Sequence, residues 1–418
     1  MNIKIRNFRS ALLLMASVLS FTAFHEISEK EKAPSPPMGW NSWNWFGKKQ
    51  INEQVVHEVI DAMSDQGLRD AGYTYVVVDG GWRDTKLSDD GKLIASPEKF
   101  SHGMKALADY AHSKGLKFGL HIVPGTADCI GDKVGGFGHE EVQLQQFIDW
   151  GIDFLKIDKC KFQGGWNEQL LKDTYQKWSR LISKRKAGIV LSISAYQFRD
   201  WYPSVGQMGR TTEDISAIAG GMSGCKAVFD DTIPETDNKW GLLSVMQIAE
   251  INNQWAGFAG HGYWNDADML VTGEQGLSGE QQKAHFALWC IMSSPLMLGN
   301  DPRNMTAAEK NIVLNKDCIA IDQDPTEQGK RVRKSGGAEI WVKKLQQGRA
   351  AVLLLNRNKL KAQDITLSFP ENDLPENLGI KDIYSKAALG NFSHSITRAV
   401  QPRTGLFLLL SKSDEDSR

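Results

Sequence analysis

Short apolar runs alternate with longer amphipathic segments between about residue 37 and residue 320. The apolar runs cover 38–40, 73–79, 117–123, 154–158, 188–194, the segment before Asp214, 262–270 and 295–298. Between them, apolar residues recur at helical spacing over 52–71, 103–114, 140–150, 168–184, 242–255, 281–292 and 307–314. Strands that alternate with helices predict a parallel sheet with right-handed crossovers. Eight such strands match the number in a (β/α)8 barrel.

An open, doubly wound sheet has the same rhythm and is the main alternative. That fold often binds its ligand at a glycine-rich turn after a strand, and no run in this chain is followed by such a turn. Polar residues suited to chemistry also follow many different runs, as they do in a barrel. We therefore predict an α/β fold with a catalytic (β/α)8 TIM barrel over residues 34–325.

The pattern changes after about Pro325. Short apolar strands separated by Gly, Asn and Pro turns follow at 339–342, 350–355, 364–369 and 406–410. This pattern predicts a C-terminal antiparallel β-sandwich over residues 326–418. A barrel takes roughly 250 residues, so two domains suit a chain of 418 residues.

The first 24 residues have the form of a secretory signal peptide. Lys4, Arg6 and Arg9 precede an apolar run over 11–24 that is short for a membrane span but suits a signal-peptide core. A polar linker, 25–33, follows without a cysteine for lipid anchoring. We predict an exported protein, periplasmic or extracellular, with no membrane span after processing. A buried N-terminal helix is the alternative, which the basic start and polar linker fit less well.

Charge and cysteine content narrow the class of protein. The chain has 49 Lys plus Arg and 50 Asp plus Glu, a net charge of -1, and no basic stripe, so nucleic acid is not an expected partner. In an oxidising compartment its five cysteines form at most two disulfides, which leaves at least one free. Cys290 lies in an apolar helical segment and is predicted to be a core residue.

Polar residues gather at the ends of the predicted strands, where barrel enzymes place their active sites. They are Asp79, His121, Lys156, Asp158, Ser194, Asp214 and Asp268. Hydrolysis of a glycosidic bond needs one carboxyl group to attack or to activate water and another to protonate the leaving oxygen; a retaining enzyme holds them roughly 5 to 5.5 Å apart. We assign these two roles to Asp158 and Asp214.

The neighbours of each carboxylate suggest its role. Lys156 lies on the same face of its strand as Asp158, where an ammonium group would keep the carboxylate ionised and nucleophilic. Asp214 must be protonated at rest, and partial burial beside other negative charges would raise its pKa accordingly. Arg210, four residues earlier, could position Asp214 or the sugar.

Tryptophan is abundant, with 13 residues, and flat rings can stack on the C–H faces of a pyranose. Those near predicted strand ends or loops are Trp40, Trp43, Trp45, Trp82, Trp166, Trp201 and Trp264. Trp289 and Trp341 are expected to serve packing only.

At these residues the chain resembles glycoside hydrolase family 27, which contains α-galactosidases and α-N-acetylgalactosaminidases. The matching motifs are 36–44, 155–160, 210–214, 263–270, 287–296 and 320–325. The resemblance implies hydrolysis with retention, Asp158 as nucleophile and Asp214 as acid/base. It also implies a terminal galactose-like sugar on an oligosaccharide or polysaccharide, contacts from Trp43, Asp79, Lys156, Arg210 and Asp268, and a disulfide between Cys129 and Cys160. No metal or organic cofactor is expected.

Departures from the family pattern concern the sugar more than the reaction. The family usually has two adjacent Asp that bind O4 and O6 of galactose, but here Gly80 follows Asp79; relatives without the second Asp include β-L-arabinopyranosidases. His121 stands where a Tyr is common. Ser194 stands where α-galactosidases carry Glu near C2, as in the N-acetylgalactosaminidase pattern, although Gln197 does not fit that pattern. A glycine-rich insert over 217–228 lengthens the loop after Asp214.

Two other classes of protein remain as alternatives. A carbohydrate-binding protein on an inactive barrel would not need two carboxylates together with Lys156 and Arg210. A phosphate-binding or divalent-metal barrel would need a glycine-rich anion turn or His and Asp at metal-ligand spacing, and neither pattern is evident.

Overall fold

The computed structural model describes residues 33–185, 187–217, 226–233 and 241–412. The predicted signal peptide, Cys225 and most of the 217–228 insert lie outside these residues. Within them, no helix is both long and apolar enough to cross a membrane.

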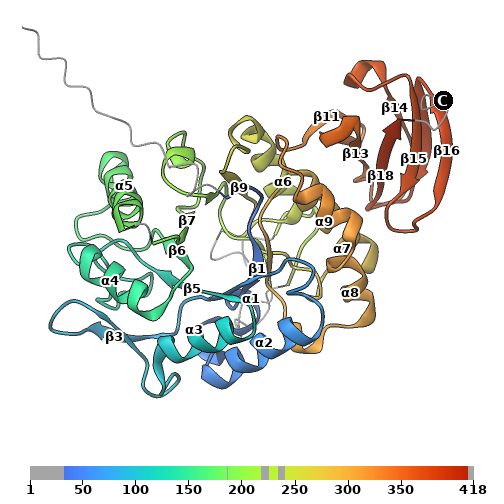
Figure 1. Ribbon diagram of the computed structural model, residues 1–418. Helices are drawn as coiled ribbons and strands as arrows, with labels where there is room; N and C mark the ends of the chain where they lie inside the picture. The colour runs from blue at the N-terminus through green and yellow to red at the C-terminus, as the bar shows by residue number, and fades with distance from the viewer. Residues whose placement is uncertain (1–32, 186, 218–225, 234–240, 413–418) are drawn as a thin grey trace, which may run out of the picture.

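Eight parallel strands form one curled sheet in the order β10-β1-β2-β5-β6-β7-β8-β9 (Figure 1). They are β1 Met38–Asn41, β2 Tyr75–Val78, β5 Lys117–Ile122, β6 Phe154–Asp158, β7 Val190–Ser194, β8 Met208–Arg210, β9 Trp264–Asp266 and β10 Leu296–Leu298. Beyond β9, Leu270 bridges to Leu298 of β10, which joins the two ends of the sheet. The predicted barrel and all eight of its strands are therefore confirmed.

The helices between the strands also follow the predicted pattern. They are α2 Glu53–Asp65, α3 Gly103–Ser113, α4 Glu140–Trp150, α5 Glu168–Arg185, α6 Val245–Gln254, α7 Gly279–Ile291 and α8 Ala307–Val313. Hydroxyl caps fix several of their starts: Ser244, Ser278 and Thr306 each form a capping box. The helix predicted over 52–71 ends early, because Gly67 adopts a left-handed conformation with φ +84°.

Some elements were not predicted. They are α1 Trp43–Gln50, the hairpin β3 Arg83–Leu87 with β4 Leu93–Ala95, α9 Lys316–Asp322, and the short 3-10 helices at Tyr202–Ser204, Ala256–Phe258, Pro302–Asn304, Gln346–Gly348 and Pro370–Asn372. The hairpin is short and mostly polar, so it carries no run of alternating apolar residues that could reveal it.

The C-terminal domain is the predicted antiparallel sandwich. One sheet has the order β11-β12-β13-β18-β15-β16, and the strands β14 and β17 form a second. Their bounds are β11 Lys330–Ser335, β12 Ala338–Lys344, β13 Ala350–Asn356, β14 Gln363–Ser368, β15 Asn377–Asp382, β16 Ala388–Ser393, β17 Ser395–Val400 and β18 Thr404–Lys412. The sequence had indicated β12, β13, β14 and β18. The others have few buried apolar positions.

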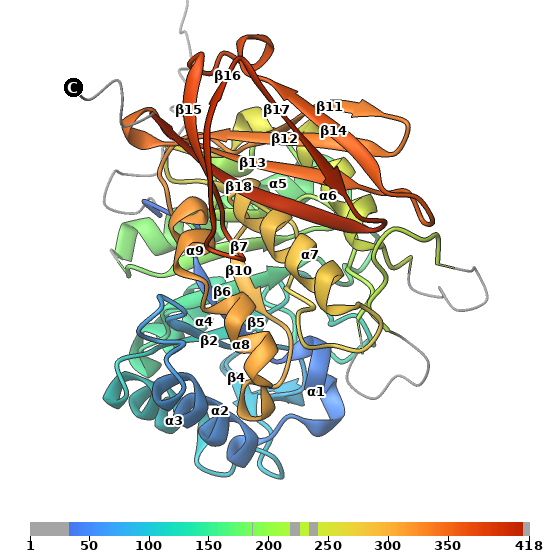
Figure 2. The same cartoon turned by 90° about the vertical axis from the view of Figure 1, so that its right-hand side faces the viewer.

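Alternation along β13 shows how the sandwich joins the barrel. Val352 and Leu354 face the interior of the sandwich, whereas Leu353 and Leu355 belong to the core shared with the barrel. Helix α7 packs against β13 and β18 on this second side (Figure 2). The two domains therefore share a continuous hydrophobic core.

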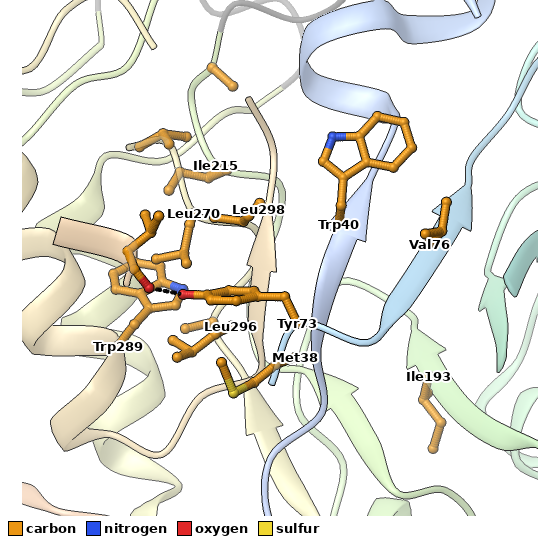
Figure 3. Close-up of a cluster of buried hydrophobic side chains, with 14 of the residues drawn as sticks. Met38, Trp40, Tyr73, Val76, Ile193, Ile215, Leu270, Trp289, Leu296 and Leu298 are labelled. Carbon is orange, nitrogen blue, oxygen red and sulfur yellow. Dashed lines mark hydrogen bonds between the residues drawn. The ribbon is translucent and has the colours of Figure 1, made fainter. Parts of the chain in front are cut away.

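That core continues around the outside of the barrel strands. Figure 3 shows part of it, where Tyr73, Trp289 and Leu296 lie together. The polar tips of both rings are satisfied, since Tyr73 donates to the carbonyl of Val313 at 2.7 Å and the Trp289 indole donates to the carbonyl of Asp268 at 2.7 Å. The second bond ties the core directly to a strand-end residue of the predicted site.

His285 of α7 is a buried polar group within this core, and it makes stability depend on pH. Its Nε2 accepts the backbone N–H of Val271 at 3.1 Å, and burial lowers its pKa to about 3. Between that value and the ordinary 6.5 the unfolded chain binds a proton that the folded chain does not. Stability should therefore fall as pH drops through this window, by at most about 1.4 kcal/mol per pH unit.

Urea unfolding of the wild type and His285→Gln between pH 7 and pH 4 measures this effect. Gln keeps an acceptor near Val271 but cannot titrate, so the stability gap between the two proteins should narrow as pH falls. A gap that stays constant would contradict the assignment, because carboxylates elsewhere affect both proteins alike.

Candidate active site

The predicted site residues all lie at the carboxyl ends of barrel strands. His121, Lys156, Asp158, Ser194 and Arg210 are in the last residues of β5, β6, β7 and β8, and Asp79 directly follows β2. Asp214 and Asp268 lie in the loops after β8 and β9, and Trp43 begins α1 after β1. The strands therefore bring residues that are far apart in sequence to one end of the barrel.

Strand alternation explains why β6 is central to this site. Leu155 and Ile157 face the outer core, while Phe154 packs in the barrel interior with Tyr75 and Val77 of β2. Lys156 and Asp158 share the side of Phe154, so both polar groups project inward from the strand end.

Asp158 is held as a carboxylate by its neighbours. Its Oδ2 lies 3.2 Å from Nε2 of His121, and because a carboxylate only accepts, His121 carries the shared proton on Nε2. Burial alone would raise the pKa of Asp158, but the His121 hydrogen bond and the charge of Lys156 bring it below its ordinary value. An ionised oxygen at this position is suited to nucleophilic attack.

Lys156 lowers the pKa of Asp158 through its charge, as expected, but its direct hydrogen bond goes to another carboxylate. Its ammonium group bonds Oδ2 of Asp79 at 2.8 Å and reaches Asp158 only through its longer-range charge. Asn41 also donates to Oδ2 of Asp79, at 2.9 Å, and the N–H of Gly80 donates to Oδ1 at 2.7 Å. Although burial would raise the pKa of Asp79, Lys156 holds it far below its ordinary range. Asp79 is therefore a fixed, charged hydrogen-bond acceptor at the end of β2.

Arg210 organises the opposite side of the site. Its guanidinium bonds Oδ1 of Asp214 at 3.0 Å and Oδ2 of Asp268 at 2.8 Å, and it is only 2 % exposed. Asp268 has a left-handed backbone, φ 73°, and its side chain also accepts the N–H groups of Ile215 and Met269. Such strain at a non-glycine residue is typical of functional sites.

The pKa of Asp214 is shifted in the opposite direction from that of Asp158. Burial and the charges of Asp268 and Asp158 raise its pKa, and Arg210 only partly opposes them. The side chain is nevertheless 45 % exposed, so solvent limits the size of this rise. Two carboxyl groups with opposite pKa shifts supply a base or nucleophile and an acid.

Asp266 at the end of β9 was not predicted as a site residue. It lies beside Arg210 and Asp268 and lines, with Asn41, Lys156 and Ser192, a cavity of about 20 Å³ at the floor of the site. Burial raises its pKa to about 6. The motif Asp266-Ala267-Asp268 was visible in the sequence, but its two carboxylates could not be told apart there.

Of the tryptophans expected to stack on a sugar, Trp43 lies at the site. A Cβ atom added to Gly80 would lie 3.3 Å from the Trp43 ring, which places the ring directly over the Asp79–Gly80 corner. Trp40, Trp82 and Trp264 are wholly buried core residues. Trp82 donates to the carbonyl of His121 at 2.9 Å and so supports that residue from behind.

The end of β7 holds Ser194, Tyr196 and a nearby disulfide. Ser194 is 1 % exposed and its Oγ makes no hydrogen bond with any described residue. Cys129 and Cys160 form a disulfide that joins the loops after β5 and β6. Cys290 and Cys318 are buried free thiols.

Arg83 is a further charged group that sequence reasoning missed. It begins β3, is half-buried beside the loop after β5, and its Nη1 has no hydrogen-bond partner among the described residues. Burial lowers its pKa, while Asp128, Asp79 and Asp158 counteract this effect. No local pattern in the polar hairpin indicated that this Arg turns toward the site.

In the described part of the chain, no three His, Cys, Asp or Glu residues are arranged as metal ligands. The acidic residues of the site are instead paired with Lys156, Arg210 and His121.

Comparison with known proteins assigns the chain to a family. Residues 35–324 match the family described as "Alpha galactosidase A", and 335–410 match the "Alpha galactosidase C-terminal beta sandwich domain". The chain is 35 % identical over 376 residues to Alpha-galactosidase 2 of Arabidopsis thaliana, covering 88 % of each. Among solved structures, α-galactosidase I of Mortierella vinacea superposes with a TM-score of 0.83 at 29 % identity, over 91 % of this chain and 98 % of that one.

A second structural neighbour shares the fold at lower identity. A family 27 β-L-arabinopyranosidase of Geobacillus stearothermophilus superposes with a TM-score of 0.76 at 22 % identity, over 93 % of this chain and 99 % of that one. The family match over residues 35–324 and the identity to the Arabidopsis relative together establish the family. The chain belongs to glycoside hydrolase family 27, the α-galactosidase family, and is a glycoside hydrolase acting on O-glycosyl bonds.

Proposed function

We propose that this chain is a retaining exo-glycosidase that removes terminal α-D-galactosyl residues from oligosaccharides or polysaccharides. The observation that carries the proposal is the pair of carboxyl groups of Asp158, at the end of β6, and Asp214, in the loop after β8. Their pKa values are shifted in opposite directions. The α-galactosidases among the relatives indicate that the sugar removed is galactose.

In this mechanism Asp158 attacks C1 while Asp214 gives its proton to the glycosidic oxygen, and the bond from C1 to that oxygen breaks. A covalent glycosyl ester on Asp158 results. Asp214, now ionised, then takes a proton from water, whose oxygen attacks C1 and releases Asp158. Two inversions at C1 give net retention.

The surrounding charges suit both steps. His121 and Lys156 stabilise the ionised Asp158 before attack and as it leaves. Arg210 holds the Asp214 side chain in one orientation through a 3.0 Å hydrogen bond. Asp214 therefore presents its proton from a fixed position. A carbohydrate-binding protein would have no use for this division of roles.

The disulfide Cys129–Cys160 also supports export, because such bonds persist in oxidising compartments. We propose, on this ground and from the N-terminal sequence, that the chain acts in the periplasm or outside the cell.

A panel of nitrophenyl glycosides tests which glycone the enzyme removes. α-D-galactoside should be the best substrate, with β-L-arabinopyranoside and α-N-acetylgalactosaminide as rivals. NMR should show that the sugar is first released with the same anomeric configuration as in the substrate. Higher kcat/KM on either rival sugar would overturn the galactose assignment while leaving the reaction class intact.

Gly80→Asp is expected to shift specificity toward galactose. Gly80 does not have a left-handed φ, so Asp fits the backbone, although the Trp43 ring must move by a few tenths of an ångström. The new carboxylate can accept a hydrogen bond from the C6 hydroxyl that galactose has and L-arabinopyranose lacks. A well-aligned charged contact is worth roughly 1.5 to 3 kcal/mol, or about 10- to 150-fold in the kcat/KM ratio.

Gly80→Asn is the matched control, because it adds similar volume without charge. The alternative is that Gly80 only lets the loop approach Trp82, and that Asp84 or His121 supplies the lost contact. If the galactoside to arabinopyranoside ratio does not rise in Gly80→Asp, specificity is set elsewhere in the site.

A further inference from the structure

Three aromatic rings form a row at the mouth of the barrel, and the proposed reaction does not use them. Phe137 lies in the loop after β5, and Phe162 and Trp166 lie in the loop after β6. Phe137 is 42 % exposed, and the other two side chains are half-buried. Ile130, in the same loop as Phe137, is 64 % exposed. Apolar side chains that remain exposed together on a surface often mark a binding site.

The three rings contact one another in sequence. The centres of the Phe137 and Phe162 rings are 4.8 Å apart, and their planes meet at 86°. The centres of the Phe162 and Trp166 rings are also 4.8 Å apart, with 42° between the planes. Aromatic pairs favour edge-to-face and offset arrangements at this spacing, so the three side chains form one packed row.

The two loops that carry the row are fixed to each other. The disulfide between Cys129 and Cys160 joins them, and Ala127 pairs with Lys161 in an antiparallel bridge. The indole of Trp166 also donates a hydrogen bond to the carbonyl of Cys160 at 2.9 Å. Rings held in place before a ligand arrives lose little conformational freedom when it binds, which favours affinity.

The row lies on the face of the barrel that carries Asp158 and Asp214. Loops that follow barrel strands lie at the carboxyl ends of those strands, where the site is. Cys160, whose carbonyl accepts the Trp166 hydrogen bond, follows Asp158 by two residues. From there the row leads to Phe137, three residues before α4. The terminal sugar occupies the pocket at Asp158, so the rest of the substrate lies outside the pocket on this same face.

We propose that Phe137, Phe162 and Trp166 form a second sugar-binding surface, on which sugars of the aglycone stack while the terminal sugar is held at Asp158. The apolar C–H face of a pyranose matches a flat aromatic ring, and none of the three side chains carries a charge that would select an ion instead. The surface therefore favours substrates with several sugar units in the aglycone over short α-galactosides. This inference rests on the proposed function and names the size of substrate that suits it.

Kinetics on α-galactosides whose aglycone grows from one sugar unit to several test this surface. In the wild type, kcat/KM should rise with aglycone length, mainly through a lower KM. Phe137→Ser and Phe162→Ser should each lower kcat/KM on the longest substrate by about 5-fold or more, because a stacking ring is lost. On methyl α-galactoside, which has no aglycone ring to stack, each should change kcat/KM by less than about 2-fold. Phe162→Leu keeps apolar volume without a flat ring, so it should resemble Phe162→Ser.

Phe258→Ser is the matched control. Phe258 is also 42 % exposed, but it lies between α6 and β9, in a segment that leads from a helix into a strand and so lies at the amino ends of the barrel strands. This substitution should leave the dependence on aglycone length unchanged. If Phe162→Ser also loses activity on methyl α-galactoside, its packing is disturbed, and Phe137→Ser and Phe162→Leu decide the test.

The outcomes separate this inference from the proposed function. If methyl α-galactoside is hydrolysed but kcat/KM does not rise with aglycone length, or rises equally in the wild type and the row variants, the inference alone is overturned. A second copy of the chain is the other candidate occupant of the row. A wild-type dimer in sedimentation that Phe137→Ser converts to a monomer would also overturn it. A wild type inactive on every α-galactoside refutes the proposed function and the inference together.

Discussion

Asp158→Asn should abolish turnover of every glycoside, by a factor of roughly 10⁴ or more in kcat. The amide keeps the size of the side chain but has no negative oxygen to attack C1, and no covalent intermediate can form. The loss should not depend on the leaving group, because even a good leaving group still needs the nucleophile. Measuring kcat on dinitrophenyl and nitrophenyl α-galactosides checks this expectation.

Trapping the intermediate gives the direct test of the same assignment. A fluorinated galactosyl donor should label the wild type on Asp158, as located by mass spectrometry, and should leave Asp158→Asn unlabelled. Asp149→Asn, an exposed carboxylate on α4, is the control for the substitution itself. A label on another residue, or an inverted product seen by NMR, would contradict the assignment.

The sequence was sufficient to predict the barrel because its parallel strands are buried. A strand such as β2, Tyr75–Val78, is wholly buried and therefore apolar along its length. Its run ends where the polar residue Asp79 begins the site. The same change from apolar to polar residues locates Asp158, so most of the candidate site follows from strand ends alone.

What the sequence could not supply are contacts that depend on distant segments. Lys156 shares a strand face with Asp158, yet its closest partner is Asp79, 77 residues earlier in the chain. His121, not Lys156, makes the direct contact to Asp158, because β5 and β6 are paired with His121 opposite Lys156. The register between paired strands determines which side chains meet. The periodicity of residues within one strand does not reveal that register.

Tyr196 and Arg83 were missed for a related reason. Each follows a strand in an irregular or polar segment, where no pattern of spacing indicates the direction of a side chain. The left-handed conformation of Tyr196 is set by the structure around it, since nothing about Tyr favours that region. Positions of this kind need coordinates to be recognised.

Asp214→Ala should give a loss that depends on the leaving group. The proton of Asp214 is needed when the departing oxygen is a poor leaving group such as a sugar alkoxide, so kcat on raffinose-like oligosaccharides should fall by roughly 10²- to 10⁴-fold. A dinitrophenolate leaves without protonation, so formation of the covalent intermediate from that substrate should be nearly unchanged. Single-turnover kinetics with both substrates measure the two cases.

The pH profile and azide provide the matching controls. In the wild type, Asp214 is protonated below its raised pKa, and activity falls as the pH rises through that pKa. This fall is the basic limb of the pH profile, and it should disappear in Asp214→Ala. Azide, which needs no general base, should restore turnover of the dinitrophenyl substrate. Glu213→Ala, the exposed neighbouring carboxylate, should keep the basic limb and normal activity. Equal losses on both leaving groups, or the same behaviour in Glu213→Ala, would remove Asp214 from the acid/base role.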